Sequence, residues 1–220
     1  MLTGSTLPAS LTVANIPASE VQALSATVGS SVTGQGADAA IGTIYYGVTD
    51  GGTDPGNWES SIELGVQFGV ARTRLTGLTE RTQYFYRAFA TNAGGGGWAS
   101  ETATLTTARL TAPSLINRSA ESLTGNSAVL WGEVTDTGND PPEVTVYYGT
   151  VDGGTDPEAW ASSAELGTDR GDFSVFVGGL DPETAYHYRS FASNAGGTAW
   201  APATESFSTT DAILPAVVVN

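Results

Sequence analysis

The stretch TIYYGVTDGGTDPGNW, residues 43–58, decides the fold because it returns almost unchanged as TVYYGTVDGGTDPEAW at residues 145–160. The offset between the two copies is 102 residues, and it stays constant on both sides of this stretch. Tyr84 matches Tyr186 and Thr107 matches Thr209, so no gap is needed from about residue 25 to residue 107. Roughly half of the paired positions are identical, which identifies a tandem duplication.

A repeat of about one hundred residues has the size of a self-contained sandwich domain. Solenoid proteins stack shorter units of roughly 20–45 residues, so the period argues against that architecture. We therefore predict two domains in series, repeat 1 over residues 1–109 and repeat 2 over residues 110–211. Residues 212–220 remain after the second repeat, and the linker is expected near residues 108–112.

Short runs with a period of two indicate the secondary structure. In the second copy Val144, Val146 and Tyr148 alternate with Thr145 and Tyr147. Such alternation places one side of a strand against a core and the other side away from it. The runs end in Gly, Asn, Asp or Pro, the residues that turn a chain, and no helical periodicity is evident. The predicted fold class is all-β.

A second motif resembles a known family. Residues 77–88 read GLTERTQYFYRA and residues 179–190 read GLDPETAYHYRS, with RAFATNAGG and RSFASNAGG continuing from the arginines. A leucine, a threonine four residues later and a tyrosine two further resemble the tyrosine corner, in which the tyrosine hydrogen-bonds back across a turn. The whole pattern is similar to strand F and the F–G loop of fibronectin type III domains, which are immunoglobulin-like β-sandwiches.

The longer block with the Asp-Gly-Gly-Thr-Asp-Pro turn looks like a bacterial variety that is repeated in very large secreted or surface proteins. This resemblance implies an extracellular or cell-surface location and a structural role. The sequence departs from the family at one point. The tryptophan usual in strand B of the animal domains has no clear equivalent, because Trp131 is out of phase and Gly29 is its partner in the first copy.

The charge of the chain excludes two classes of partner. It has 23 acidic and 8 basic residues, no lysine, and a formal net charge of −15. Nucleic acids and anionic membrane surfaces would repel such a protein. The absence of cysteine excludes disulfides and thiolate metal sites. No apolar run approaches the roughly 20 residues that span a bilayer, so no membrane insertion is expected.

No catalytic residue is predicted. The single histidine, His187, stands where the first copy has Phe85, which indicates a strand position that accepts any planar ring. Glu63 and Glu165 recur, but a glycosidase-like pair of carboxylates would then have to operate in both copies. We expect the chain not to be an enzyme.

The repeated Asp-Gly-Gly-Thr-Asp-Pro turn is the best candidate for metal chemistry. Asp50 with Asp54, and Asp152 with Asp156, place two carboxylates four residues apart on a glycine-rich loop. Oxygen ligands of this kind suit calcium, so calcium is a possible cofactor. The alternative is that the aspartates cap the turn while Gly-Gly supplies a positive φ and a tryptophan holds the loop on the sheet.

Trp131 is the candidate for ligand binding. Its phase points away from the predicted core, and the first copy has Gly29 at this position. A tryptophan ring in such a place can stack on a sugar, for example of a surface polysaccharide, or take part in an interface. The other interpretation is that it packs against the adjacent module.

The last residues continue the duplication into a third copy. At the same offset Pro215 aligns with Pro113, so residues 212–220 are expected to form the first strand of a further repeat. Two interpretations stay open. Either the chain is an excerpt from a longer array, or the apolar segment with Leu214, Val217, Val218 and Val219 is a donor strand that completes a sheet of another copy.

The sequence thus predicts a non-catalytic structural or adhesive module of an extracellular surface protein or filament. Its expected partners are other copies of itself or neighbouring repeats. Two alternatives are a virion decoration or fibre component, and a carbohydrate-binding accessory module of a secreted enzyme.

Overall fold

The computed structural model describes residues 11–34 and 39–211, and the chain divides into two compact units. Module 1 comprises Met1–Arg109, and module 2 comprises Leu110–Asn220. The predicted donor-strand residues Leu214, Val217, Val218 and Val219 lie outside the described residues.

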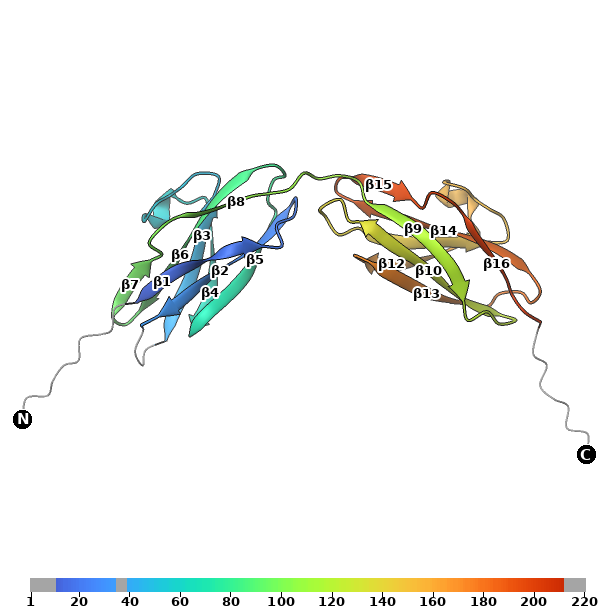
Figure 1. The fold of residues 1–220 in the computed structure, drawn as a ribbon, viewed down its shortest axis with the longest axis horizontal. Helices are drawn as coiled ribbons and strands as arrows, with labels where there is room; N and C mark the ends of the chain where they lie inside the picture. The colour runs from blue at the N-terminus through green and yellow to red at the C-terminus, as the bar shows by residue number, and fades with distance from the viewer. Residues whose placement is uncertain (1–10, 35–38, 212–220) are drawn as a thin grey trace, which may run out of the picture. The chain divides into compact units, whose positions relative to one another are not determined.

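Module 1 consists of two antiparallel sheets (Figure 1). The three-stranded sheet has the order β1-β2-β5, and the other sheet has the order β4-β3-β6-β7, with β8 pairing to β6. The strands are β1 (Thr12–Ser19), β2 (Ser25–Thr33), β3 (Ala40–Gly47), β4 (Ser60–Gln67), β5 (Gly69–Thr76), β6 (Gln83–Asn92), β7 (Gly95–Trp98) and β8 (Ala103–Thr106).

Module 2 repeats this topology, with sheets of order β9-β10-β13 and β12-β11-β14-β15, and β16 pairs with β14. The strands are β9 (Ser114–Glu121), β10 (Ser127–Asp136), β11 (Glu143–Gly149), β12 (Ser162–Thr168), β13 (Asp172–Gly178), β14 (Ala185–Asn194), β15 (Gly197–Trp200) and β16 (Glu205–Ser208). Both modules are fibronectin type III-like β-sandwiches, so the predicted all-β fold class is confirmed.

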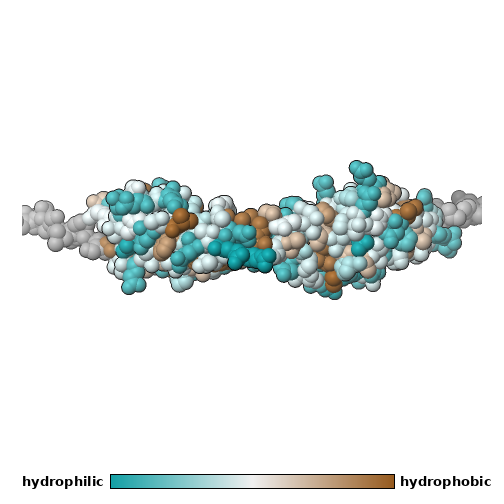
Figure 2. All heavy atoms as spheres, turned by 90° about the horizontal axis from the view of Figure 1, so that it is seen from above, coloured by the Kyte–Doolittle hydropathy of each residue, from teal (hydrophilic) through white to brown (hydrophobic). Residues whose placement is uncertain are grey.

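The alternation in the sequence places one side of each strand in a core. In β11 the side chains of Val144 and Val146 are buried and belong to the same hydrophobic cluster as Leu130 and Tyr188. Module 1 has its own cluster, so each module buries apolar surface independently. On the outside, apolar residues form small groups among hydrophilic ones on the face shown in Figure 2.

The predicted tyrosine corner is present in both modules. The Thr79 amide donates a hydrogen bond to Tyr84 Oη at 3.0 Å, and the Asp181 amide donates to Tyr186 Oη at the same distance. A buried threonine closes the same turn, because Thr107 Oγ1 donates to the Thr79 carbonyl at 2.6 Å and accepts from the Thr82 amide at 2.9 Å. Hydrogen bonds therefore hold both the amide and the carbonyl of Thr79 in this turn.

An asparagine fastens the first strand of each module to the opposite sheet. Asn15 Oδ1 accepts from the Ala88 amide at 2.8 Å, and its Nδ2 donates to the Glu101 carbonyl at 2.7 Å. Asn117 makes the equivalent bonds in module 2. Because β1 is also paired with β2, it is an integral part of its sandwich. No helix in the described part of the chain has the length and apolar character needed to cross a membrane.

Candidate functional site

The first aspartate of each repeated turn holds the loop to the segment just before β8 or β16. Asp50 Oδ1 accepts hydrogen bonds from the Gly52 amide and from Thr102 Oγ1, both at 2.9 Å. Asp152 accepts from the corresponding amide and hydroxyl at 2.8 and 3.0 Å. The pKa of Asp152 is lowered, chiefly because the Gly154 amide stabilises the ionised carboxylate.

The second aspartate caps a short 3-10 turn, η1 (Pro55–Asn57) or η2 (Pro157–Ala159). Asp54 Oδ1 accepts from the Gly56 amide at 2.9 Å, and Asp156 Oδ1 accepts from the Glu158 amide at 3.0 Å. Within residues 11–34 and 39–211, no group of three or more acidic or histidine side chains could hold a metal ion. The geometry supports the capping interpretation, and calcium binding stays a prediction.

The glycines of the turn make room for a tryptophan. A Cβ on Gly51 would lie 2.6 Å from Cδ1 of Trp58, and a Cβ on Gly153 would lie 2.6 Å from Cδ1 of Trp160. Both tryptophans are buried. Gly51 and Gly153 are therefore needed for close approach of the tryptophan ring. The next residue in the first copy, Gly52, supplies the positive φ of 63°.

His187 lies on β14 opposite Ser206 of β16 and Gly149 of β11. Among the described residues, no hydrogen bond joins the side chains of His187 and Ser206. Module 1 has Phe85 and Thr104 at these two positions, paired in the same register. This arrangement supports the interpretation of His187 as a strand position rather than a catalytic base.

Trp131 lies on the outer side of the three-stranded sheet of module 2, as its phase predicts. Its neighbours Leu130 and Gly132 are buried, whereas Trp131 is half-buried and lies opposite Arg118 on β9 and Ser174 on β13. We call this surface the Trp131 face. It comprises outward side chains of β9, β10 and β13, namely Arg118, Glu121, Trp131, Glu133, Asp172 and Phe176.

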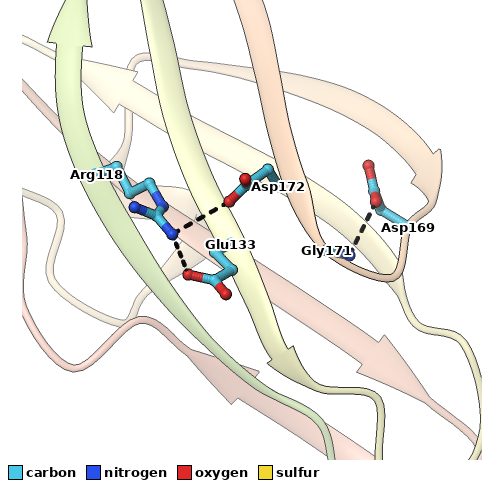
Figure 3. A network of polar contacts seen from close by, with 5 residues as sticks. All are labelled: Arg118, Glu133, Asp169, Gly171 and Asp172. Atoms are coloured by element: carbon cyan, nitrogen blue, oxygen red, sulfur yellow. Dashed lines mark hydrogen bonds and ion pairs between the residues drawn. The ribbon is translucent and has the colours of Figure 1, made fainter.

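Arg118 joins the three strands of this face. Its guanidinium Nη2 forms ion pairs with Glu133 of β10 and with Asp172 of β13, the latter at 3.2 Å (Figure 3). Figure 3 also shows Asp169 Oδ1 accepting from the Gly171 amide, at 3.3 Å, in the turn that leads into β13. Two carboxylates share one cation here, so the network keeps a negative charge.

A hollow of about 330 Å³ lies beside the tryptophan ring and is lined by Arg118, Ser119, Glu121, Trp131 and Asp172. The indole Nε1 of Trp131 is buried and has no hydrogen-bond partner among the described residues. On the same face the side chain of Phe176 is 69% exposed. The face thus combines exposed aromatic surface with excess negative charge, which suits a partner that is apolar and cationic.

An aromatic cluster that the sequence analysis did not predict covers the outer side of each larger sheet. The ring centroids of Tyr45 and Trp98 are 5.0 Å apart, and those of Phe89 and Trp98 are 4.9 Å apart. Tyr147, Phe191 and Trp200 repeat the cluster with distances of 5.1 and 5.0 Å. These rings lie on three different strands and contact one another, so the cluster stabilises the sheet in both modules.

No protein-family model and no curated protein matches the sequence. Among solved structures, the sensor domain of the anti-sigma factor RsgI4 in Pseudobacteroides cellulosolvens is similar over 45% of this chain and 95% of that chain, with 20% identity and a TM-score of 0.33. The FN1–FN3 domains of chicken CNTN1 are similar over 94% of this chain and 67% of that chain, with 18% identity and a TM-score of 0.37. Similarity at these sequence identities and TM-scores does not indicate a function.

Proposed function

We propose that this chain is a non-catalytic structural module of an extracellular surface protein or filament, in which two rigid sandwiches act as a spacer. One observation carries the proposal. Many of the polar side chains that are identical in both copies bond to the backbone and fix turns and strand ends, which is the chemistry of a scaffold rather than of a reaction centre.

The arginines of β6 and β14 illustrate this use of polar groups. Arg87 Nε donates to the Ala99 carbonyl at 2.8 Å, and Arg189 Nε donates to the Ala201 carbonyl at 2.8 Å. Both guanidiniums also donate to the next carbonyl along the chain, at 2.9 and 3.1 Å. Each arginine therefore fastens the segment before the last strand of its module, which would resist peeling of that strand under load.

The recurring aspartates and threonines serve in the same way. Asp50 and Asp152 bond to turn amides, and Thr107 and Thr209 close the tyrosine corners. A reaction centre needs a nucleophile, a base or a metal held close to its partners and open to substrate. Side chains committed to backbone groups are not available for those roles, and this supports a passive function.

Stretching single molecules of the full chain tests the proposal. A spacer should extend in two separate, abrupt unfolding events, one for each module. With about 3.6 Å per residue, a module of about 100 residues releases at most about 36 nm of chain. Smooth extension at low force, without two such steps, would contradict a load-carrying role. Localisation is tested separately by immunolabelling intact cells of the source organism, where surface signal is expected.

A further inference from the structure

Charge is divided unequally between the two modules. Residues 1–109 contain 8 acidic and 5 basic residues, whereas residues 110–220 contain 15 acidic and 3 basic residues. Their formal net charges are therefore −3 and −12. By net charge alone every pairing of modules from two copies is repulsive, most strongly between two copies of module 2, so attraction between copies has to come from the local charge of particular faces.

The three-stranded sheets carry this difference in a concentrated form. Strands β1, β2 and β5 contain no acidic residue and two arginines, Arg72 and Arg74. Strands β9, β10 and β13 contain four acidic residues and one arginine; they are Glu121, Glu133, Asp136, Asp172 and Arg118. The three-stranded sheet is thus positively charged in module 1 and negatively charged in module 2.

The surface of module 1 that corresponds to the Trp131 face is exposed and cationic. We call it the Arg72 face, and it comprises outward side chains at Ile16, Ser31, Val70, Arg72 and Arg74, with the buried Gly29 beneath Arg72. Arg74 donates to Gln22 Oε1 at 3.1 Å and to Ser25 Oγ at 2.8 Å. Neither Arg72 nor Arg74 forms a salt bridge within the described residues, so both keep their full charge for a partner.

Apolar groups accompany the charges on both faces. On the Arg72 face Val70 is 61% exposed, and on the Trp131 face Phe176 is 69% exposed. Such side chains, next to charges of opposite sign on the partner, are the usual composition of an interface core with a polar rim. Arginine in particular stacks well on the face of a tryptophan ring.

The two faces differ at matched positions. At the offset of 102 residues, Gly29 corresponds to Trp131, Val70 to Asp172, and Arg74 to Phe176. Where module 2 has a large ring in the middle strand, module 1 has bare backbone, and Gly29 lies opposite Arg72 in the sheet. The Arg72 side chain covers Gly29, because its Cγ lies 3.1 Å from where a Cβ on Gly29 would be, so an approaching tryptophan ring would stack on the arginine.

We propose that the Trp131 face of one chain binds the Arg72 face of a second copy. This inference rests on the proposed function and adds the mode of assembly to it. Arg72 and Arg74 meet Glu133, Asp172 and the Trp131 ring, and Val70 meets Phe176. Because the two surfaces are different, a pair of chains in this contact leaves one face of each kind free for further copies, and the contact can repeat from chain to chain.

Sedimentation velocity of the full chain tests the proposal over a range of concentrations, at low and at high salt. We expect concentration-dependent association that salt weakens, since exposed charges are screened at high ionic strength. The variant Arg72→Glu with Arg74→Glu should weaken association about tenfold or more, as expected for lost and reversed interface charge pairs. Trp131→Ala should also weaken it, while the far-ultraviolet circular dichroism of each variant stays unchanged.

The double variant Arg81→Glu with Arg109→Glu is the matched control, because it changes the net charge equally but lies outside the face. A wild-type chain that remains monomeric near millimolar concentration would overturn the proposal. So would equal weakening by the control, or binding of a polysaccharide probe that depends on Trp131 in a chain that does not associate. The stretching experiment on monomers is independent of these outcomes, so failure of assembly and failure of the spacer function are distinguishable.

Discussion

Replacing the tyrosine of each corner with phenylalanine removes a single oxygen atom. Tyr84 and Tyr186 are each 7% exposed, and their Oη atoms accept the amides of Thr79 and Asp181 at 3.0 Å. Phenylalanine keeps the ring, including the stacking of residue 186 on Phe207 at a centroid distance of 5.5 Å. The substitution therefore probes the hydrogen bond without opening a cavity.

The expected loss of stability follows from the surroundings of the amide. A hydrogen bond contributes about 0.5–1.5 kcal/mol net, and a donor left buried and unpaired costs about 1–3 kcal/mol. Thr79 and Asp181 are exposed residues, so water can partly replace the lost acceptor. We expect each variant to destabilise its own module by about 1 kcal/mol, which corresponds to a fall of about 4–8 °C in melting temperature for a domain of this size.

Hydrogen exchange followed by mass spectrometry measures this effect on the intact chain. Tyr84→Phe should speed exchange in peptides of module 1, with the largest local change at residues 79–84, and Tyr186→Phe should do the same in module 2. Tyr45→Phe is the control, because it removes the same atom from a ring in the outer aromatic cluster. If residues 79–84 exchange no faster in Tyr84→Phe than in Tyr45→Phe, the role assigned to the Tyr84 hydroxyl is refuted.

Three further expectations concern pH, packing and metal. Burial raises the pKa of the Tyr86 and Tyr188 phenols, so the folded state favours the protonated form. Urea denaturation should therefore show the full free energy of unfolding below about pH 10 and a decline above it. Tyr188→Phe should make that decline less steep. Gly153→Ala should destabilise module 2 by about 1–3 kcal/mol, because its methyl group displaces the Trp160 ring, and thermal melts will measure this. Melting curves with calcium and with chelator should coincide if the turn aspartates act only as caps, and a higher melting temperature in calcium would instead support a calcium site.

The parts of the structure that sequence could predict are those that local pattern encodes. Alternation placed Val144 and Val146 inward, and the leucine–threonine–tyrosine spacing identified the corners at Tyr84 and Tyr186. In these cases each residue's role depends on neighbours a few positions away. A constant offset then transferred every assignment from one copy to the other, so a single correct interpretation described two domains.

The ion pairs of Arg118 could not be predicted in this way. Arg118, Glu133 and Asp172 are separated by 15 and 39 residues, and they meet because β10 lies between β9 and β13 in a particular register. Alternation says which side of a strand a residue occupies, but not which residue of the next strand lies opposite. The aromatic cluster around Trp98 escaped prediction for the same reason, since its rings come from three strands.

The duplication itself separates scaffold from function. Where both copies keep the same residue, as at Tyr84 and Tyr186, the side chain makes the same hydrogen bond in each module. The backbone is therefore constant, and differences on it are free to serve something other than folding. The difference between Arg74 in module 1 and Phe176 in module 2 lies on the outer side of the corresponding strands and alters no corner. Such a difference changes what the surface can bind, and on the three-stranded sheets differences in charge and in ring content occur close together. The opposite sign of the two outer surfaces is what the proposed contact between copies requires.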